Sequence, residues 1–165
     1  MASGVIGFPR TINEKAARVV AGVVALTALA ALLIPAHWLL VPLAYGFWAR
    51  VLTGPRLSPL GRLASRVIAP RLGAPKPVPG PPKRFAQGIG AAITTAAVAA
   101  WVLGATGTVE ALLALLVVAA TLESALAFCA GCQIFALLMR AGVIPDEICA
   151  ECGDIWSRRR PGSTT

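Results

Sequence analysis

The sequence predicts an all-α, polytopic membrane protein with about four transmembrane helices. Of its 165 residues, 57% are hydrophobic and only 13% are charged, whereas about a quarter of the residues in a soluble domain are charged. The apolar residues also gather in blocks long enough to cross a hydrocarbon core of about 30 Å. We therefore expect a membrane domain over residues 1–140 and a cysteine-containing segment with a basic tail over residues 141–165.

Four apolar blocks supply the expected spans. The second block is short and contains Pro42 and Gly46, so it crosses only if it is kinked or if the bilayer thins locally. The fourth block has no strong helix breaker before Gly142, so it is either one helix that projects beyond the membrane or a helix bent around Gly131. The expected spans are residues 16–34, 37–52, 85–104 and 109–130.

Basic residues set the expected orientation. Residues 50–84 contain eight Lys and Arg residues and no acidic residue, whereas the turns at 35–37 and 105–108 contain neither Lys nor Arg. By the positive-inside rule, both termini and the middle loop are cytoplasmic. Within this loop, residues 58–69 have the pattern of an amphipathic interfacial helix, and six prolines in residues 70–85 predict a stiff, extended connector.

The basic loop and tail have two interpretations. Attraction to anionic lipid headgroups is favoured, and docking of a soluble partner is the alternative. The net charge of +8 does not indicate nucleic-acid binding, because no aromatic residues are interleaved with the basic ones and no nucleic-acid-binding module is present.

Small residues recur every four positions in the third and fourth blocks. Such stripes allow helix backbones to approach closely. We expect these two helices to pack on their stripes, or one stripe to form an oligomer contact. The stripes are Gly88, Ala92, Ala96, Ala100 and Gly104 in the third block, and Ala119, Glu123, Ala127 and Gly131 in the fourth.

Glu123 interrupts the second stripe. Counting about 1.5 Å per residue from Glu110 places it about 20 Å along the helix, within the hydrocarbon region. A carboxylate there is costly unless it is protonated or paired. Since the expected spans offer no deep Lys or Arg, Thr94 and Thr95 are the expected hydrogen-bond partners, with Ser124 adjacent. Glu123 either handles protons or a ligand, or joins two helices as a neutral acid.

All four cysteines follow the fourth block as two C-x-x-C pairs, Cys129 with Cys132 and Cys149 with Cys152, separated by sixteen residues. This spacing lies in the range of four-cysteine zinc sites. On spacing alone, metal or soft-cation binding is the first interpretation. The first pair, however, begins at the end of an expected spanning helix, whereas zinc ribbons supply ligands from turns.

Thiol chemistry is the competing interpretation of the same cysteines. A C-x-x-C pair can form a disulfide, and a helix N-terminus lowers the pKa of its first thiol. Cys129 is expected inside a helix, which would remove that effect. The two dithiols could nevertheless pass a disulfide between them. Inert structural cysteines are the third interpretation; permanent disulfides are unexpected on the reducing cytoplasmic side.

Three stretches carry a family resemblance: FPRTINEKAARVVAG, PRLGAPKPVPGPPKRFAQGIG and CAGCQIFALLMRAG. They resemble a bacterial integral membrane family catalogued as domain-of-unknown-function family 4395. The resemblance implies a bacterial inner-membrane protein. It also implies an association with thioredoxin-like or rhodanese-like proteins, which favours thiol or sulfur handling over metal binding.

The sequence therefore predicts thiol or sulfur handling at the cytoplasmic face. Cys129 and Cys132 form the candidate catalytic dithiol, and Glu123 is the candidate proton acceptor. Cys149 and Cys152 are either its exchange partner or, with the first pair, the ligands of zinc or iron. The remaining alternative is an accessory subunit of a larger membrane complex, or a homo-oligomer, held by the small-residue stripes.

Overall fold

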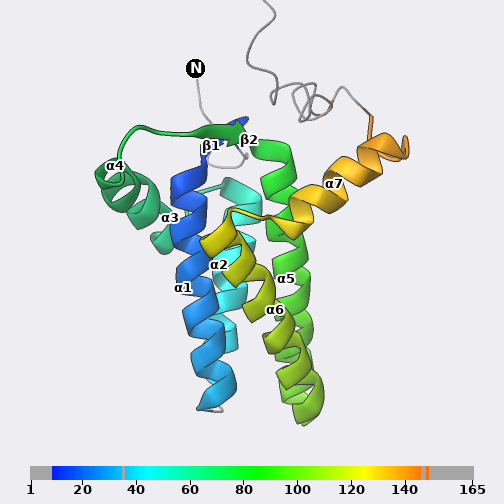
Figure 1. Cartoon of the computed structure of the whole chain (residues 1–165). Helices are drawn as coiled ribbons and strands as arrows, with labels where there is room; N and C mark the ends of the chain where they lie inside the picture. Colours follow the sequence, from blue (N-terminus) through cyan, green and yellow to red (C-terminus); the bar gives the residue numbers. More distant parts are fainter. Residues whose placement is uncertain (1–8, 35, 146–147, 149–165) are drawn as a thin grey trace, which may run out of the picture.

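The computed structural model describes residues 9–34, 36–145 and 148, and it confirms the all-α class. Three helices are long and apolar enough to cross a membrane (Figure 1): α1 (Glu14–Leu33), α5 (Gly80–Val102) and α6 (Thr106–Leu126). The 3₁₀ turn η1 (His37–Leu39) leads into a shorter helix, α2 (Leu40–Thr53). At about 1.5 Å per residue, α2 rises about 21 Å, less than a hydrocarbon core of about 30 Å. The count of four spans stays a prediction.

Two helix pairs form the bundle. α1 packs mainly on α6, and α2 packs mainly on α5. The buried face of α1 is rich in alanine, and Gly22 lies so close to α6 that a Cβ placed there would be 2.9 Å from Ser124 Oγ. Because lipid provides no hydrophobic drive between helices, such close backbone approach is what holds the pair together.

The small-residue stripe of α5 does not pack on α6 as expected. Ala92 and Ala96 are exposed, and nothing lies within 4 Å of a Cβ placed on Gly88. The buried face instead contains Gly90, which lies against the ring of Phe47 on α2. α5 packs on α2, α6 and α7, so its buried face is shared among these neighbours. An oligomer contact through the exposed stripe stays a prediction.

A short antiparallel ladder joins the starts of α1 and α5. β1 (Thr11–Asn13) pairs with β2 (Pro77–Pro79), with Ile12 opposite Val78. Backbone hydrogen bonds extend the ladder on both sides, from Glu14 N to Lys76 O at 2.9 Å and from Gly80 N to Arg10 O at 2.7 Å. The ladder therefore fixes the first turn of α5 beside the start of α1.

The proline-rich connector is extended only in part. Its residues 77–79 form β2, but Pro81 and Pro82 lie in the first turn of α5. Proline is tolerated there because the first N–H groups of a helix have no intrahelical partner. The third helix thus begins five residues earlier than expected, at Gly80 rather than Phe85.

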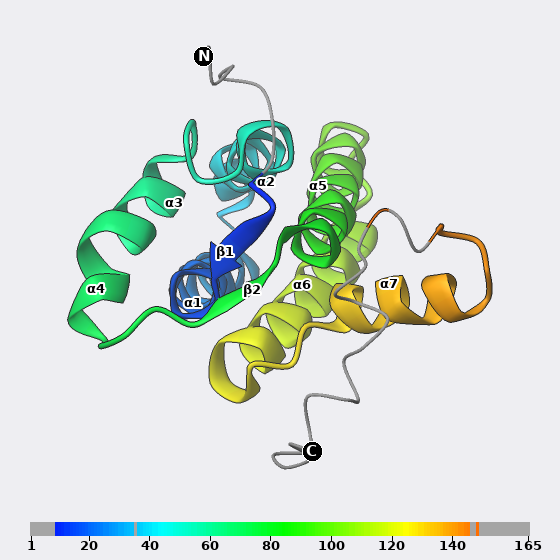
Figure 2. The ribbon, with the colours of Figure 1, turned by 90° about the horizontal axis from the view of Figure 1, so that it is seen from above.

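The expected amphipathic helix is present over residues 59–71. It consists of three consecutive helical segments: α3 (Pro59–Leu63), the π-helical turn η2 (Ala64–Ile68) and α4 (Ala69–Arg71). Ser58 Oγ caps it by accepting the Gly61 N–H. Small residues such as Ala64 face the bundle, while Leu63 and Arg66 are exposed. Seen from above, this segment and α7 (Ala130–Arg140) flank the bundle on opposite sides (Figure 2).

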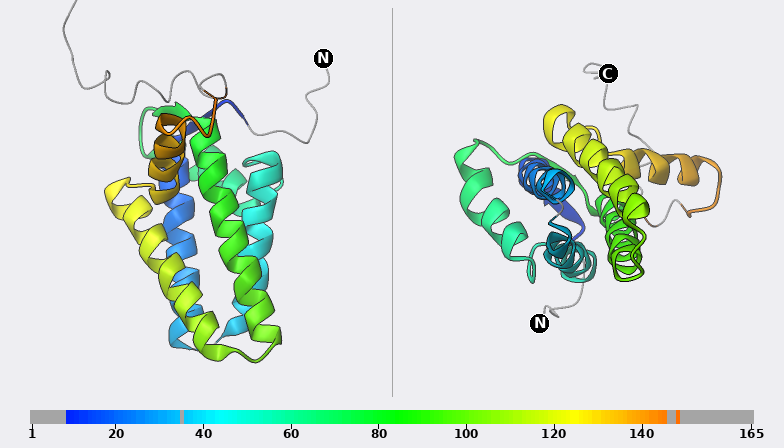
Figure 3. Two further views of the ribbon diagram at one scale, coloured as in Figure 1. Left: turned by 90° about the vertical axis from the view of Figure 1, so that its right-hand side faces the viewer. Right: turned by 90° about the horizontal axis from the view of Figure 1, so that it is seen from below.

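The fourth apolar block is divided into α6 and α7. α5 and α6 lie close at their connecting turn and diverge towards the other end, where α7 begins between them (Figure 3). α6 ends at Leu126, and Ala127 has a left-handed backbone with φ 55°. The break lies at residues 127–129 rather than at Gly131, which is already inside α7.

Two glycine-to-alanine substitutions in α5 distinguish the effect of helix propensity on stability from the effect of packing against α2. We expect Gly90→Ala to destabilise the fold by about 1–3 kcal/mol, because its Cβ would overlap the buried Phe47 ring. Gly88→Ala adds the same methyl group in open space and should be neutral or stabilising by up to about 1 kcal/mol. Thermal unfolding in detergent, followed by circular dichroism, compares the two. Equal melting temperatures would contradict the α2–α5 packing.

Candidate functional site

The dithiol lies at the junction of α6 and α7. After Ala127 reverses the chain, Cys129 has an extended backbone and occupies the N-cap position of α7. Its carbonyl accepts the Gln133 N–H at 3.1 Å, which is the first bond of the new helix. The expectation that Cys129 lies inside a helix is therefore wrong. The first cysteine of the pair instead has the helix-terminal position that favours a thiolate.

The two sulfurs are in direct contact. Cys132 Sγ donates to Cys129 Sγ at 2.6 Å, and both are free thiols. This hydrogen bond holds the pKa of Cys129 below its ordinary value; Lys83 acts in the same direction, while burial and Glu123 oppose it. The same hydrogen bond, together with burial, raises the pKa of Cys132. The pair is therefore polarised, with Cys129 the more acidic of the two thiols.

Gly131 brings the dithiol against α5. A Cβ placed on it would lie 2.6 Å from both Cα and Cβ of Ala86. One turn further along α7, Phe135 packs on Phe85 with ring centroids 5.7 Å apart. The glycine inside the C-x-x-C motif thus permits close approach to the first turns of α5.

Lys83 on α5 is the partner of Glu123. Its Nζ lies 2.5 Å from Glu123 Oε1, and the two side chains are 9% and 14% exposed. The expected partners are wrong: Thr94 donates to carbonyls of its own helix, and so does Thr95, which also accepts from Trp48 Nε1. Glu123 lies in the last turn of α6 because that helix ends at Leu126, so the ion pair lies at the end of the bundle that carries the dithiol.

A second polar contact lies one turn along α5. Arg50 of α2 is 6% exposed and donates from Nε to Gln87 Oε1 at 2.7 Å. The Arg50 guanidinium also lies over the Phe47 ring, 4.7 Å from its centroid. Lys83 and Gln87 share one face of α5 because they are four residues apart. The three helices α2, α5 and α6 thus meet through polar side chains at one end of the bundle.

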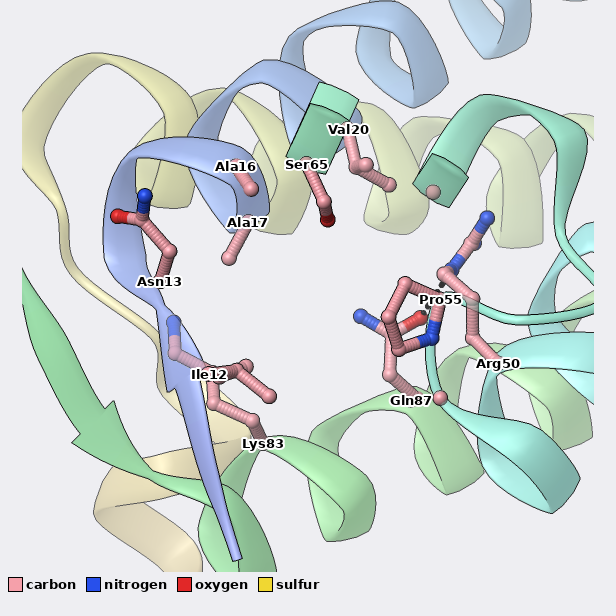
Figure 4. A pocket seen from close by; sticks show the side chains of 12 residues that line it. Ile12, Asn13, Ala16, Ala17, Val20, Arg50, Pro55, Ser65, Lys83 and Gln87 are labelled. Carbon is pink, nitrogen blue, oxygen red and sulfur yellow. Dashed lines mark hydrogen bonds between the residues drawn. The ribbon is translucent and has the colours of Figure 1, made fainter. Parts of the chain in front are cut away.

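A small pocket of about 60 Å³ opens beside these groups. Lys83, Gln87 and Arg50 lie along its wall, with Ala16 and Val20 of α1 on another side (Figure 4). The pocket is large enough for water. Ile12 and Asn13 of β1 also line it, so it lies beside the β1–β2 ladder.

Sequence reasoning missed Lys83, Arg50 and Gln87. Lys83 follows two prolines, which predict a loop, and Arg50 lies at the end of an expected span. One sequence signal could have indicated them: Lys83, Gln87, Gly90 and Thr94 recur at three- and four-residue spacing, which places basic, polar and small residues on one helix face.

The structure describes only two of the four cysteines of the predicted metal site, Cys129 and Cys132. Cys149 and Cys152 lie outside the described residues. Among the residues that are described, no group of three or more His, Cys, Asp or Glu side chains could hold a metal ion. Cys129 and Cys132 offer two thiolate ligands, so zinc or iron binding by all four cysteines stays a prediction.

The buried and exposed ion pairs of this chain form a matched test. We expect Lys83→Met to destabilise the protein by about 3–5 kcal/mol, because it leaves the Glu123 carboxylate buried without a partner. Lys76→Met removes the partner of Glu14, but Lys76 is 66% exposed, so the loss should be below about 1 kcal/mol. Adding Glu123→Leu to Lys83→Met should restore much of the stability. Thermal unfolding of all the variants measures these losses of stability. Equal losses for Lys83→Met and Lys76→Met would contradict a buried Lys83–Glu123 pair.

Comparison with known proteins gives one family match. The model of the family described as Domain of unknown function (DUF4395) matches residues 12–140. That range includes Cys129, Cys132, Lys83 and Glu123, and it ends before Cys149. No curated protein and no solved structure matches the chain. Since the match covers more than half of the sequence, the chain belongs to the DUF4395 family.

Proposed function

We propose that this protein is a thiol/disulfide exchange protein of the bacterial inner membrane, with Cys129 and Cys132 as its redox pair. The observation that carries the proposal is the polarised dithiol at the start of α7, beside the buried Lys83–Glu123 ion pair. Redox-active C-x-x-C pairs characteristically have a first thiol of lowered pKa at a helix N-terminus.

The different exposure of the two cysteines supports an assignment of which one a partner attacks and which one leaves. Cys129 is 7% exposed, whereas Cys132 is only partly buried. When the pair is oxidised, a thiolate of a soluble partner dithiol attacks Cys132 Sγ, the Cys129–Cys132 bond breaks, and Cys129 leaves as a thiolate. The second partner thiol then attacks the mixed disulfide and releases Cys132. Two electrons pass to the membrane protein, and the partner leaves as a disulfide.

The polarised pair suits these roles. A leaving thiol of low pKa departs faster, and Lys83, which lowers the pKa of Cys129, can still do so when Cys132 is held in the mixed disulfide and has no proton to donate. Glu123 is the proposed proton acceptor and donor for the pair, since its carboxylate lies near enough to both thiols to raise their pKa and accepts a hydrogen bond from Lys83 Nζ. Proteins of the thioredoxin-like or rhodanese-like kind are the proposed soluble partners.

Charge distribution supports a cytoplasmic site. Arg10, the basic residues at the start of α1 and those of the 59–71 helical segment lie at the same end of the bundle as the dithiol, whereas the turns at residues 36 and 103–105 carry no Lys or Arg. By the positive-inside rule, the dithiol end faces the cytoplasm. The exposed Arg62, Arg66 and Arg71 are the proposed contacts to anionic lipid headgroups.

Native mass spectrometry tests the proposal. For the anaerobically purified full chain carrying Cys149→Ser and Cys152→Ser, oxidation should remove two hydrogens, and a reductant should restore them. The further variant Cys129→Ser should remove this change and trap a mixed disulfide through Cys132. A bound zinc or iron mass on the wild-type chain would contradict the exchange proposal and favour the metal site. Reduced cysteines that resist oxidation, with assembly intact, would favour an accessory subunit.

The pH dependence of Cys129 alkylation tests the polarisation. With Cys149→Ser, Cys152→Ser and Cys132→Ser, the serine hydroxyl can still donate to Cys129, so the reaction with iodoacetamide should reach half its maximum rate below the pH of an ordinary cysteine. Cys132→Ala in place of Cys132→Ser removes the donor, so the profile should shift to higher pH.

Charge changes should shift the same profile in opposite directions. Lys83→Met removes a charge that lowers the pKa of Cys129, so the inflection should rise. Glu123→Gln removes a charge that raises this pKa, so the inflection should fall. Lys76→Met is the control and should leave it unchanged. Shifts of the same sign for Lys83→Met and Glu123→Gln would contradict an electrostatic role for the ion pair.

A further inference from the structure

A cavity of about 280 Å³ lies inside the bundle, between the α1–α6 and α2–α5 pairs. Most of its wall is apolar, formed by side chains such as Val24, Ile93 and Leu116. The polar or reactive side chains on the wall are Arg50, Gln87, Glu123 and Cys129. The cavity is larger than the roughly 150 Å³ apolar cavity that accommodates benzene in an engineered protein, so a substituted ring fits it.

The two sulfurs of the dithiol have different surroundings. Cys129 lines this cavity and is 7% exposed. Cys132 is partly buried and does not line it. A soluble protein can therefore approach Cys132, whereas a reactant for Cys129 has to be small and apolar enough to occupy the bundle interior.

We infer that the cavity binds the ring of a lipid-soluble quinone, which oxidises the Cys129–Cys132 dithiol. The inference rests on the proposed thiol/disulfide function and names its membrane-side electron acceptor. In the reaction, two S–H bonds break and one S–S bond forms. Two electrons and two protons pass to the two carbonyl oxygens of the quinone, which leaves as the quinol.

The cavity matches the chemistry of a quinone in three respects. Its apolar wall suits the ring and the start of a prenyl tail. The N–H groups of Arg50 and Gln87 are donors for carbonyl oxygens, which accept hydrogen bonds. A quinone takes up two electrons and two protons, the same number that a dithiol releases. It also resides in the bilayer, where the long apolar helices α1, α5 and α6 would place the cavity.

The test uses the full chain with Cys149→Ser and Cys152→Ser, reduced anaerobically in detergent. Decyl-ubiquinone is the lipophilic oxidant, because its fully substituted ring avoids stable thiol adducts, and glutathione disulfide is the soluble oxidant. Thiol loss and quinol absorbance are followed by stopped flow. We expect decyl-ubiquinone to oxidise two thiols per chain and to form one quinol.

Matched leucine substitutions on α6 locate the reaction. Ala120 lines the cavity and Ala114 is exposed on the same helix. Ala120→Leu should slow the reaction with quinone at least tenfold and leave the reaction with glutathione disulfide unchanged; Ala114→Leu should change neither. Ile93→Phe fills the cavity from α5 and serves as a second variant if Ala120→Leu folds poorly.

The outcomes separate this inference from the proposed function. If glutathione disulfide oxidises the pair and decyl-ubiquinone does not, the quinone inference is overturned and the exchange proposal stands. If both cavity variants react with quinone at the wild-type rate, the cavity is not the quinone site and the inference is also overturned. If neither oxidant forms the Cys129–Cys132 disulfide, both proposals fail together.

Discussion

The Lys83–Glu123 ion pair connects the first turn of α5 to the last turn of α6, where these two helices have diverged most. Two buried charges are tolerated only with close geometry and further polar neighbours. Here the β1–β2 ladder fixes the position of Lys83, and the left-handed turn at Ala127 ends α6 just after Glu123. The dithiol follows directly, so the same constraint that keeps the charges together also places Cys129 beside them.

The divergence of α5 and α6 has a second effect on the bundle. It opens interior space between two tightly packed helix pairs, and small residues such as Ala119 and Ala120 leave that space unfilled. α7 begins at the open end, with Gly131 lying against Ala86. One arrangement of helices thus gives the dithiol one sulfur, of Cys129, beside the interior cavity, while Cys132 does not line that cavity.

The apolar blocks predicted the all-α class and the three long helices well, because long hydrophobic runs leave few other structures in lipid. The reactivity of the C-x-x-C pair stays a prediction, although the structure places its two sulfurs in contact. The break before Cys129 was not predicted, because alanine rarely adopts a left-handed backbone and neither Gly nor Pro marks residues 127–129. Lys83 was missed because Pro81 and Pro82 suggest a connector, although proline also begins helices. The error about Glu123 followed from this one, since the lysine that pairs with it had been assigned to a loop.

The β1–β2 ladder has a consequence for how the protein is made. Its strands flank the segment that contains α1, α2 and the 59–71 helical segment, and they are separated by more than sixty residues of chain. During synthesis β1 leaves the ribosome first and has no partner until β2 follows. The first turn of α5 becomes fixed only when this long loop closes, and Cys129 is synthesised later still. The dithiol is thus completed at a late stage of biogenesis, so a chain truncated before α6 would contain the ladder but no cysteine.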